Sequence, residues 1–263
     1  MAEHIPRKRF GQNFLHDQHV IQRIIGCIAP EPGDTVTEIG PGLGALTNPL
    51  LQKLQKLDVI ELDRDLADRL EQHPDYGKKL FVHRADALKF EFCSLAGNGK
   101  LRIVGNLPYN ISTPLIFHLL TQQSCIRDMT FMLQKEVVDR IVAAPGGKDY
   151  GRLSIMVQAQ CRCQRLFIVK PGAFNPPPKV DSAIVQLVPE PEHSKTVISM
   201  DLFERVVRQA FSQRRKTLRN TLKGLVTVEQ LQQTGIDAQN RPEALSVDEY
   251  IAISNLIANQ SPG

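Results

Sequence analysis

The sequence predicts an α/β fold, with a doubly wound sheet followed by a small C-terminal domain built only of helices. Short runs rich in Val and Ile alternate with amphipathic stretches, as buried parallel strands and their covering helices do. A polar segment punctuated by prolines then ends this alternation, and the pattern after it is helical. A length of 263 residues suffices for a full α/β core and a smaller appended domain.

The elements follow in order along the chain. Five apolar runs predict the parallel strands of the sheet: 35–39, 57–62, 80–83, 101–105 and 129–133. Amphipathic stretches predict the helices that connect them: 46–54, 66–71 and 113–120. Alternation of this kind predicts right-handed crossovers.

The segments after the fifth strand are more varied. Residues 136–144 predict a helix, whereas 153–159 fits a helix or a strand equally well. The runs 166–169 and 183–188, joined by a proline-rich turn, predict an antiparallel hairpin that closes one edge of the sheet.

A domain boundary is expected at Pro189 to Ser194, which is polar and rich in proline. We therefore predict one domain over residues 1–190 and a helical domain over residues 198–263. Within the second domain, Leu202, Val206 and Ala210 share one helical face.

The composition argues against several protein classes. The basic residues at the N-terminus are followed by no apolar segment, so a secretory signal is not expected. No apolar run approaches the ~18 residues of a membrane span. The 5 cysteines are odd in number and include no Cys-x-x-Cys pair, which predicts neither a disulfide framework nor a zinc site. We expect a cytoplasmic protein without a metal or a membrane partner.

A glycine-rich loop, residues 38–44 (Glu-Ile-Gly-Pro-Gly-Leu-Gly), follows the first strand directly. Glycines allow a tight turn and a close approach of the backbone to a ligand. Taken alone, the loop also fits a nicotinamide-dependent dehydrogenase or a plain strand-to-helix turn. However, it lacks the Gly-x-Gly-x-x-Gly spacing that seats a pyrophosphate on a helix N-terminus. The loop therefore favours a donor without phosphates, S-adenosylmethionine.

Two carboxylates support this interpretation. Glu61 ends the second strand, where it can accept hydrogen bonds from both hydroxyls of an adenosine ribose, and Asp86 ends the third, where it can accept from an adenine amino group. The alternatives are a solvated helix start for Glu61 and an N-cap for Asp86. Together with the loop, these features favour a Rossmann-like class I methyltransferase sheet.

A tetrapeptide, Asn106-Leu107-Pro108-Tyr109, follows the fourth strand. This motif suits methylation of the exocyclic N6 of adenine. That nitrogen is a poor nucleophile because its lone pair is delocalised into the ring. The Asn106 side-chain oxygen and the Leu107 carbonyl can accept from its hydrogens and free that lone pair. Pro108 fixes the turn, and Tyr109 offers a face on which an unstacked base can lie. Alone, the same four residues also fit a proline turn with a half-buried tyrosine.

Basic residues without any acidic residue among them occupy 205–223 and predict contact with RNA phosphates: Arg205, Arg208, Arg214, Arg215, Lys216, Arg219 and Lys223. A solvated helix face, the usual alternative, normally mixes charges of both signs. The same positive electrostatic field is expected to include contributions from Arg7, Lys8 and Arg9.

Further motifs complete the pattern: Arg-Phe-Gly-Gln-Asn-Phe-Leu at 9–15, Phe-Met-Leu-Gln-Lys-Glu-Val at 131–137, and Phe-x-Pro-Pro-Pro-Lys-Val-Asp-Ser at 174–182. With these, nearly the whole chain resembles the bacterial dimethyladenosine transferases, the 16S ribosomal RNA adenine N6,N6-dimethyltransferases. The resemblance implies transfer of two methyl groups to each of two adjacent adenosines in a hairpin near the 3′ end of 16S rRNA. It also implies a monomer acting on the small ribosomal subunit or its precursor.

The resemblance also implies roles for individual residues. Asn13 and Leu15 are expected to close over the methyl donor, and Gly40 to lie under its amino-acid part. Glu61 then holds the ribose, Asp86 holds the adenine, and Asn106 stands between donor and target. Phe174 is implied as a second aromatic that clamps the target base opposite Tyr109, although a core aromatic beside prolines fits the sequence equally well.

Three other functions compete with this one. A large-subunit rRNA adenine methyltransferase of the antibiotic-resistance type shares the fold, but the run 176–181 and the basic helix argue against it. DNA adenine methyltransferases usually carry Pro-Pro-Tyr or Pro-Pro-Phe after their Asp or Asn, whereas Leu107 follows Asn106 here and argues against that function. A ribosome-assembly factor with incidental methylation is the alternative from another class.

Overall fold

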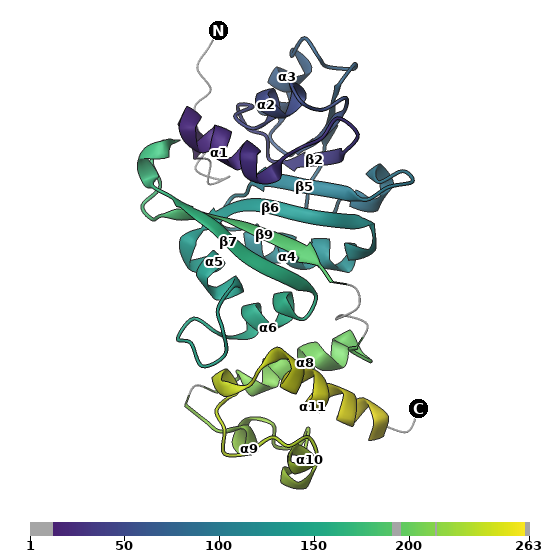
Figure 1. The fold of residues 1–263 in the computed structure, drawn as a ribbon, viewed down its shortest axis with the longest axis vertical. Helices are drawn as coiled ribbons and strands as arrows, with labels where there is room; N and C mark the ends of the chain where they lie inside the picture. The colour runs from purple at the N-terminus through teal and green to yellow at the C-terminus, as the bar shows by residue number, and fades with distance from the viewer. Residues whose placement is uncertain (1–12, 191–195, 214, 261–263) are drawn as a thin grey trace. The chain divides into compact units, whose positions relative to one another are not determined.

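The structure is a computed structural model that describes residues 13–190, 196–213 and 215–260 (Figure 1). It divides into two compact units. The first contains the chain up to residue 138 together with 164–189, and the second contains the remainder.

These compact units differ from the predicted domains, residues 1–190 and 198–263, which stay a prediction. The boundary after residue 189 is present, but 139–163 also belongs to the second unit. The physical reason is helix packing, because α6 (Arg152–Gln158) contacts α8 (Met200–Ala210). The chain therefore passes between the units more than once.

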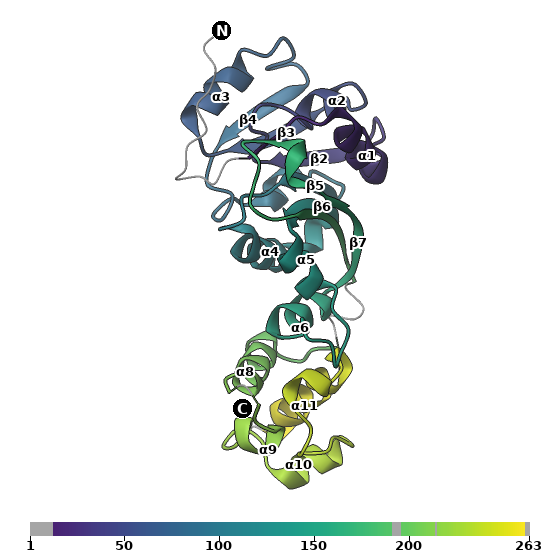
Figure 2. The same cartoon turned by 90° about the vertical axis from the view of Figure 1, so that its left-hand side faces the viewer.

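The first unit is built on a seven-stranded sheet with the order β4-β3-β2-β5-β6-β9-β7 (Figure 2). Its strands are β2 Thr35–Ile39, β3 Leu57–Glu61, β4 Leu80–Arg84, β5 Leu101–Asn106, β6 Ile126–Gln134, β7 Cys161–Val169 and β9 Ser182–Pro189. The first five are parallel, and β9 runs antiparallel to β6. Because β2 lies between β3 and β5, the strand order reverses there, and ligands bind at the carboxyl edge of such a point.

Helices cover this sheet: α1 Gln18–Ile28, α2 Thr47–Leu51, α3 Arg64–Glu71, α4 Ser112–Thr121 and α5 Lys135–Ile141. The first two lie on one side of the sheet and α4 on the other (Figures 1 and 2). The α1 helix begins at Asp17, whose side chain accepts a hydrogen bond from the Val20 N–H at 3.1 Å. It buries four isoleucines against the sheet: Ile21, Ile24, Ile25 and Ile28. The predicted α/β fold is confirmed.

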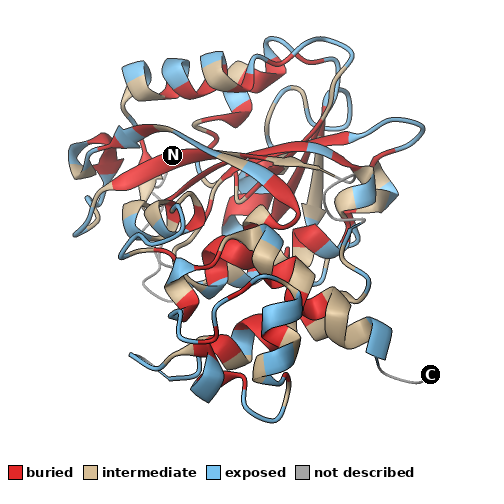
Figure 3. Cartoon of the chain, turned by 60° about the horizontal axis from the view of Figure 1, so that its bottom comes forward, coloured by how far each residue is buried: buried red, intermediate tan, exposed pale blue. Residues whose placement is uncertain are grey.

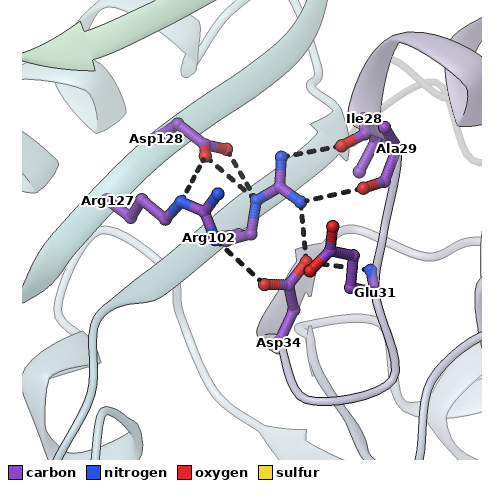
Figure 4. Close-up of polar contacts among 7 residues, drawn as sticks. All are labelled: Ile28, Ala29, Glu31, Asp34, Arg102, Arg127 and Asp128. Carbon is purple, nitrogen blue, oxygen red and sulfur yellow. Dashed lines mark hydrogen bonds and ion pairs between the residues drawn. The ribbon is translucent and has the colours of Figure 1, made fainter.

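A buried arginine ties the amino ends of the strands to α1 (Figure 4). The Arg102 guanidinium donates to Asp128 Oδ2 at 2.9 Å and to Asp34 Oδ2 at 2.7 Å. It also donates to the carbonyl of Ile28 at 2.7 Å, which caps the last turn of α1. Because Arg102 lies at the start of β5 and Asn106 at its end, this cluster is at the edge of the sheet remote from the tetrapeptide.

A two-stranded ribbon joins distant parts of the chain. The strand β1 (Phe14–Leu15) pairs antiparallel with β8 (Phe174–Asn175), with Leu15 directly opposite Phe174. Neither strand is predictable from the sequence, because two residues show no periodicity.

The second unit consists of helices in its C-terminal part: α8, α9 Leu218–Thr221, α10 Val228–Gln233 and α11 Val247–Gln260. The α8 helix buries Phe203, Val206, Val207 and Ala210. On α11, Tyr250 is buried and its hydroxyl donates to the Pro242 carbonyl at 2.8 Å. Figure 3 shows buried residues along the strands and on one face of these helices. The undecided segment 153–159 falls largely within the helix α6.

A disulfide between Cys93 and Cys125 differs from the expectation of none. These cysteines lie 32 residues apart and belong to no spacing motif that would predict the pair. In the described part of the chain, no helix is both long and apolar enough to cross a membrane. Within the same residues, no group of three or more His, Cys, Asp or Glu side chains is arranged to hold a metal ion.

Candidate functional site

A pocket opens at the carboxyl ends of β2, β3 and β5, and the ribbon β1–β8 contributes to its wall. All of it belongs to the first unit. The pocket brings together the residues of the first unit that were predicted to be catalytic or to bind the donor or the target base: Asn13, Leu15, Gly40, Glu61, Asp86, Asn106, Leu107, Pro108, Tyr109 and Phe174.

The glycine loop after β2 turns through the left-handed region of backbone space. Gly40, Gly42 and Gly44 have φ values of 65°, 57° and 86°, which side chains disfavour. A Cβ atom on Gly42 would also lie 3.3 Å from the Phe14 ring. The loop thus presents bare backbone to the pocket, as close approach of a ligand requires.

Glu61 connects this loop to the segment after β3. Its Oε2 accepts from the Gly42 N–H at 3.3 Å, and its Oε1 accepts from the Asp63 N–H at 2.9 Å. Burial raises the pKa of Glu61, and both backbone hydrogen bonds oppose that rise. Each carboxylate oxygen has a second lone pair, so both can also accept from hydroxyl donors such as those of a ribose.

Glu38 is a second buried acid in the pocket, which the sequence analysis named only as the start of the loop. It accepts from the Thr47 hydroxyl at 2.7 Å. Burial raises its pKa to about 7, against the hydrogen bond from Thr47, which lowers it. No sequence signal gives such burial, since Glu38 reads as the polar end of a strand.

Leu62, in the motif Glu61-Leu62-Asp63, also lines the pocket, although no role was predicted for it. Its side chain is 55% exposed, although it is large and apolar. An apolar residue within the acidic run 61–65 was the available signal, because exposed apolar side chains beside polar ones often contact ligands.

Asp86 lies where either of its two predicted roles is possible. Its Oδ1 accepts from the Leu88 N–H at 3.0 Å, which is the cap-like contact of the structural alternative. The residue also lines the pocket beside Ala85 and Ala87. Capping through one oxygen leaves the other available to a ligand.

The tetrapeptide is fixed by the strands on either side of it. The Leu107 N–H donates to the Met132 carbonyl at 3.1 Å, and the Asn106 Nδ2 donates to the Asn13 carbonyl at 3.2 Å. The latter bond orients the amide, so that its oxygen is the acceptor offered to the pocket. Gly105 directly precedes the tetrapeptide. A Cβ atom on it would lie 2.5 Å from the Ile39 carbonyl oxygen, so β5 packs closely on β2.

The two aromatic residues differ in exposure. Tyr109 is half-buried, and its hydroxyl lies 2.8 Å from the Ser182 hydroxyl. Phe174 is only 3% exposed and belongs to the hydrophobic core, yet it lines the same pocket. The core interpretation and the clamp interpretation are therefore compatible for Phe174.

The basic residues of the second unit lie on its surface. Arg215 and Arg219 are exposed, as are Arg205, Arg208, Lys216 and Lys223. Arg214 lies outside the described residues, as do Arg7, Lys8 and Arg9.

The fold and the pocket define a class I methyltransferase that uses S-adenosylmethionine. The family described as "Ribosomal RNA adenine dimethylase" matches residues 3–259. The ribosomal RNA small subunit methyltransferase A of Aromatoleum aromaticum is 56% identical over 100% of this chain and 98% of its own length. The protein of the same name from Pseudomonas aeruginosa is also 56% identical, over 100% of this chain and 98% of its own length.

Two solved structures are similar over more than nine-tenths of the chain. A dimethyladenosine transferase from Plasmodium falciparum has a TM-score of 0.76 and 27% identity, covering 91% of this chain and 95% of that one. The 23S rRNA methyltransferase ErmE has a TM-score of 0.69 and 25% identity, covering 94% of this chain and 100% of that one. The chain belongs to the ribosomal RNA adenine dimethylase family.

Proposed function

We propose that this protein transfers methyl groups from S-adenosylmethionine to N6 of two adjacent adenosines in the 3′-terminal hairpin of 16S rRNA. The product is N6,N6-dimethyladenosine in the small ribosomal subunit. The observation that carries the proposal is the Asn106 amide, fixed by the Asn13 carbonyl at the carboxyl end of β5 in a member of this family.

The donor side of the pocket uses residues from three strand ends. S-adenosylmethionine supplies an electrophilic methyl group on its sulfonium. Glu61 accepts from the ribose hydroxyls, and Asp86 accepts from the adenine amino group. Gly40 lies under the amino-acid part, while Asn13 and Leu15 close over the donor.

The target side uses the tetrapeptide. The Asn106 side-chain oxygen and the Leu107 carbonyl accept from the two hydrogens of N6, which directs the nitrogen lone pair toward the methyl group. Pro108 keeps the turn rigid, and the base lies between Tyr109 and Phe174. Alignment dominates the rate of such a direct displacement, so no strong base is needed.

RNA outside the pocket is held by phosphate contacts. Arg215 and Arg219, together with Arg214, supply positive charge from the second unit. The partner is 16S rRNA in the small subunit or its precursor, which locates the protein in the cytoplasm. Action as a monomer, as the resemblance implies, is part of the proposal.

An Asn106→Ala variant tests the proposal against an assembly factor whose methylation is incidental. Small subunits that lack the modification are incubated with protein and labelled donor, and their nucleosides are analysed by mass spectrometry. We expect N6,N6-dimethyladenosine with the native protein, none with Asn106→Ala, and equal binding of both to the subunits. Asn98→Ala, at an exposed residue outside the pocket, is the control. Dimethyladenosine formed by Asn106→Ala at the native rate contradicts the proposal.

A further inference from the structure

Tyr109 is held at both ends by serine hydroxyls. At the ring end, its phenol oxygen lies 2.8 Å from Ser182 Oγ. At the backbone end, its carbonyl accepts from Ser112 Oγ at 3.1 Å. The first contact fixes the ring and the second fixes the main chain, so they act on different degrees of freedom.

Ser182 offers its hydroxyl from a rigid position. It is the first residue of β9, it is 0% exposed, and it stands opposite Gln134 of β6. Immediately before it, the Asp181 carbonyl accepts from the Lys135 N–H at 2.9 Å. The Asp181 carboxylate also pairs with Lys170 Nζ at 2.7 Å. A hydroxyl on such a strand end has little freedom to follow a moving partner.

The Ser182 side chain is otherwise hard to explain. A buried hydroxyl without a partner costs free energy, and an apolar side chain would suit a fully buried strand position better. Tyr109 is the partner that satisfies this hydroxyl. Burial raises the pKa of Tyr109, and the hydrogen bond with Ser182 opposes that rise. The contact is therefore felt by the Tyr109 hydroxyl as well as by that of Ser182.

We propose that Ser182 is a positioning residue for methyl transfer, whose hydroxyl holds the long axis of the Tyr109 ring in place against the target adenine. The inference rests on the proposed function of Tyr109 as a face for that base. The phenol oxygen is the atom farthest from the backbone, so a hydrogen bond to it limits the swing of the whole ring about the Cα–Cβ bond. Because the displacement depends on alignment, a looser ring slows the chemical step and leaves binding of the RNA at remote phosphates intact.

The test compares Ser182→Ala, Tyr109→Phe and the double variant with the native protein on unmodified small subunits. We expect kcat to fall about fivefold in each single variant, the value of one net hydrogen bond, with KM for the subunits unchanged. The double variant is expected to be no slower than either single variant, because both remove the same bond. Calorimetric titration with S-adenosylmethionine supplies the active fraction, to which kcat is normalised, and its Kd is expected to be unchanged.

Thr130→Val is the matched control, since Thr130 is buried on the neighbouring strand β6 and its hydroxyl has no partner in the described residues. It is expected to keep the native kcat. A native kcat in Ser182→Ala, or losses that multiply to about 25-fold in the double variant, overturns the inference. If Tyr109→Ala keeps the native kcat, Tyr109 is not part of the site and the inference fails with it. If the native protein forms no dimethyladenosine, the proposed function itself is contradicted.

Discussion

Glu61 shows how one side chain can serve both the fold and the ligand. Its carboxylate accepts one backbone N–H from the glycine loop and one from the segment after β3, and it is 7% exposed. Any ligand that it binds therefore meets a carboxylate that is already oriented. Pre-orientation of this kind lowers the entropy lost on binding.

We predict that Glu61→Ala weakens donor binding by about tenfold or more, since it removes charge-assisted acceptors from the pocket. Isothermal calorimetry with S-adenosylmethionine measures the change, and affinity for small subunits is expected to stay the same. Asp65→Ala, at an exposed acid of the same run, is the control. Equal donor affinity in Glu61→Ala and the native protein would exclude Glu61 from the site.

Glu38 leads to a pH prediction at the same scale. Folding raises its pKa from 4.5 to about 7, so the folded state keeps a proton that the unfolded state has lost between these values. The contribution of Glu38 to stability therefore falls as the pH rises through this window. Glu38→Gln mimics the protonated form and can still accept from Thr47.

The expected result is that Glu38→Gln gains stability relative to the native protein as the pH rises from about 4.5 to 7, by on the order of 1–3 kcal/mol. Thermal unfolding midpoints of both proteins across this range measure it. A constant difference between the two midpoints would mean that Glu38 titrates alike in both states.

Among the elements, the amino edge of the sheet depends on Arg102. It joins β5, β6 and the C-terminus of α1, and its side chain is 8% exposed. We predict that Arg102→Ala destabilises the protein by about 3–5 kcal/mol, because it removes the buried partner of two largely buried carboxylates, Asp34 and Asp128. Chemical denaturation measures the loss, and donor affinity at the opposite edge is expected to persist in the folded fraction.

Arg127 provides the matched control. It pairs with the same carboxylates, Asp34 and Asp128, but its side chain is 58% exposed. Water screens such a pair, so Arg127→Ala is expected to cost only about 0–1 kcal/mol. Similar losses in both variants would show that burial is not what makes the cluster important.

The sequence predicts elements well where burial makes a long apolar run. The strand 35–39 agrees with β2 at both ends, and the other parallel strands agree within a few residues. The helix expected over 46–54 shortens to α2 Thr47–Leu51. The segment 153–159 stayed undecided because five consecutive buried residues, 153–157, hide the helical period.

The site residues are predictable for a different reason. Glu61 and Asn106 end parallel strands and Asp86 lies two residues after another, and parallel strands bring their carboxyl ends to one edge. Contacts made by tertiary structure leave no such trace. The Ser182 hydroxyl, the burial of Glu38 and the Leu15–Phe174 pairing all depend on segments far apart in sequence.

At the scale of the whole molecule, the acidic and basic residues are distributed unevenly. The stretch 205–223 carries only positive side chains among its charged residues, although the formal net charge of the chain is only +4. A small net charge combined with a local excess of positive side chains favours binding of a polyanion at that one surface.

We predict that changing Arg214, Arg215 and Arg219 together to Glu lowers affinity for small subunits by about a hundredfold or more at physiological salt. Co-sedimentation with 30S particles over a series of salt concentrations measures it, and donor affinity is expected to be unchanged. Lys53, Lys78 and Lys79, exposed residues of the first unit, are changed to Glu as a control with the same net charge. Comparable losses in both triple variants would assign the effect to net charge alone.

The ribbon β1–β8 makes two proposed functions mechanically inseparable. Leu15 and Phe174 are register partners, and the His16 N–H also donates to the Ala173 carbonyl at 3.0 Å. One is proposed to cover the donor and the other the target base, so the two are expected to shift together. A Phe174 variant that loses donor affinity therefore does not locate the donor at Phe174, and release of the used donor and release of the base are expected to share one opening motion.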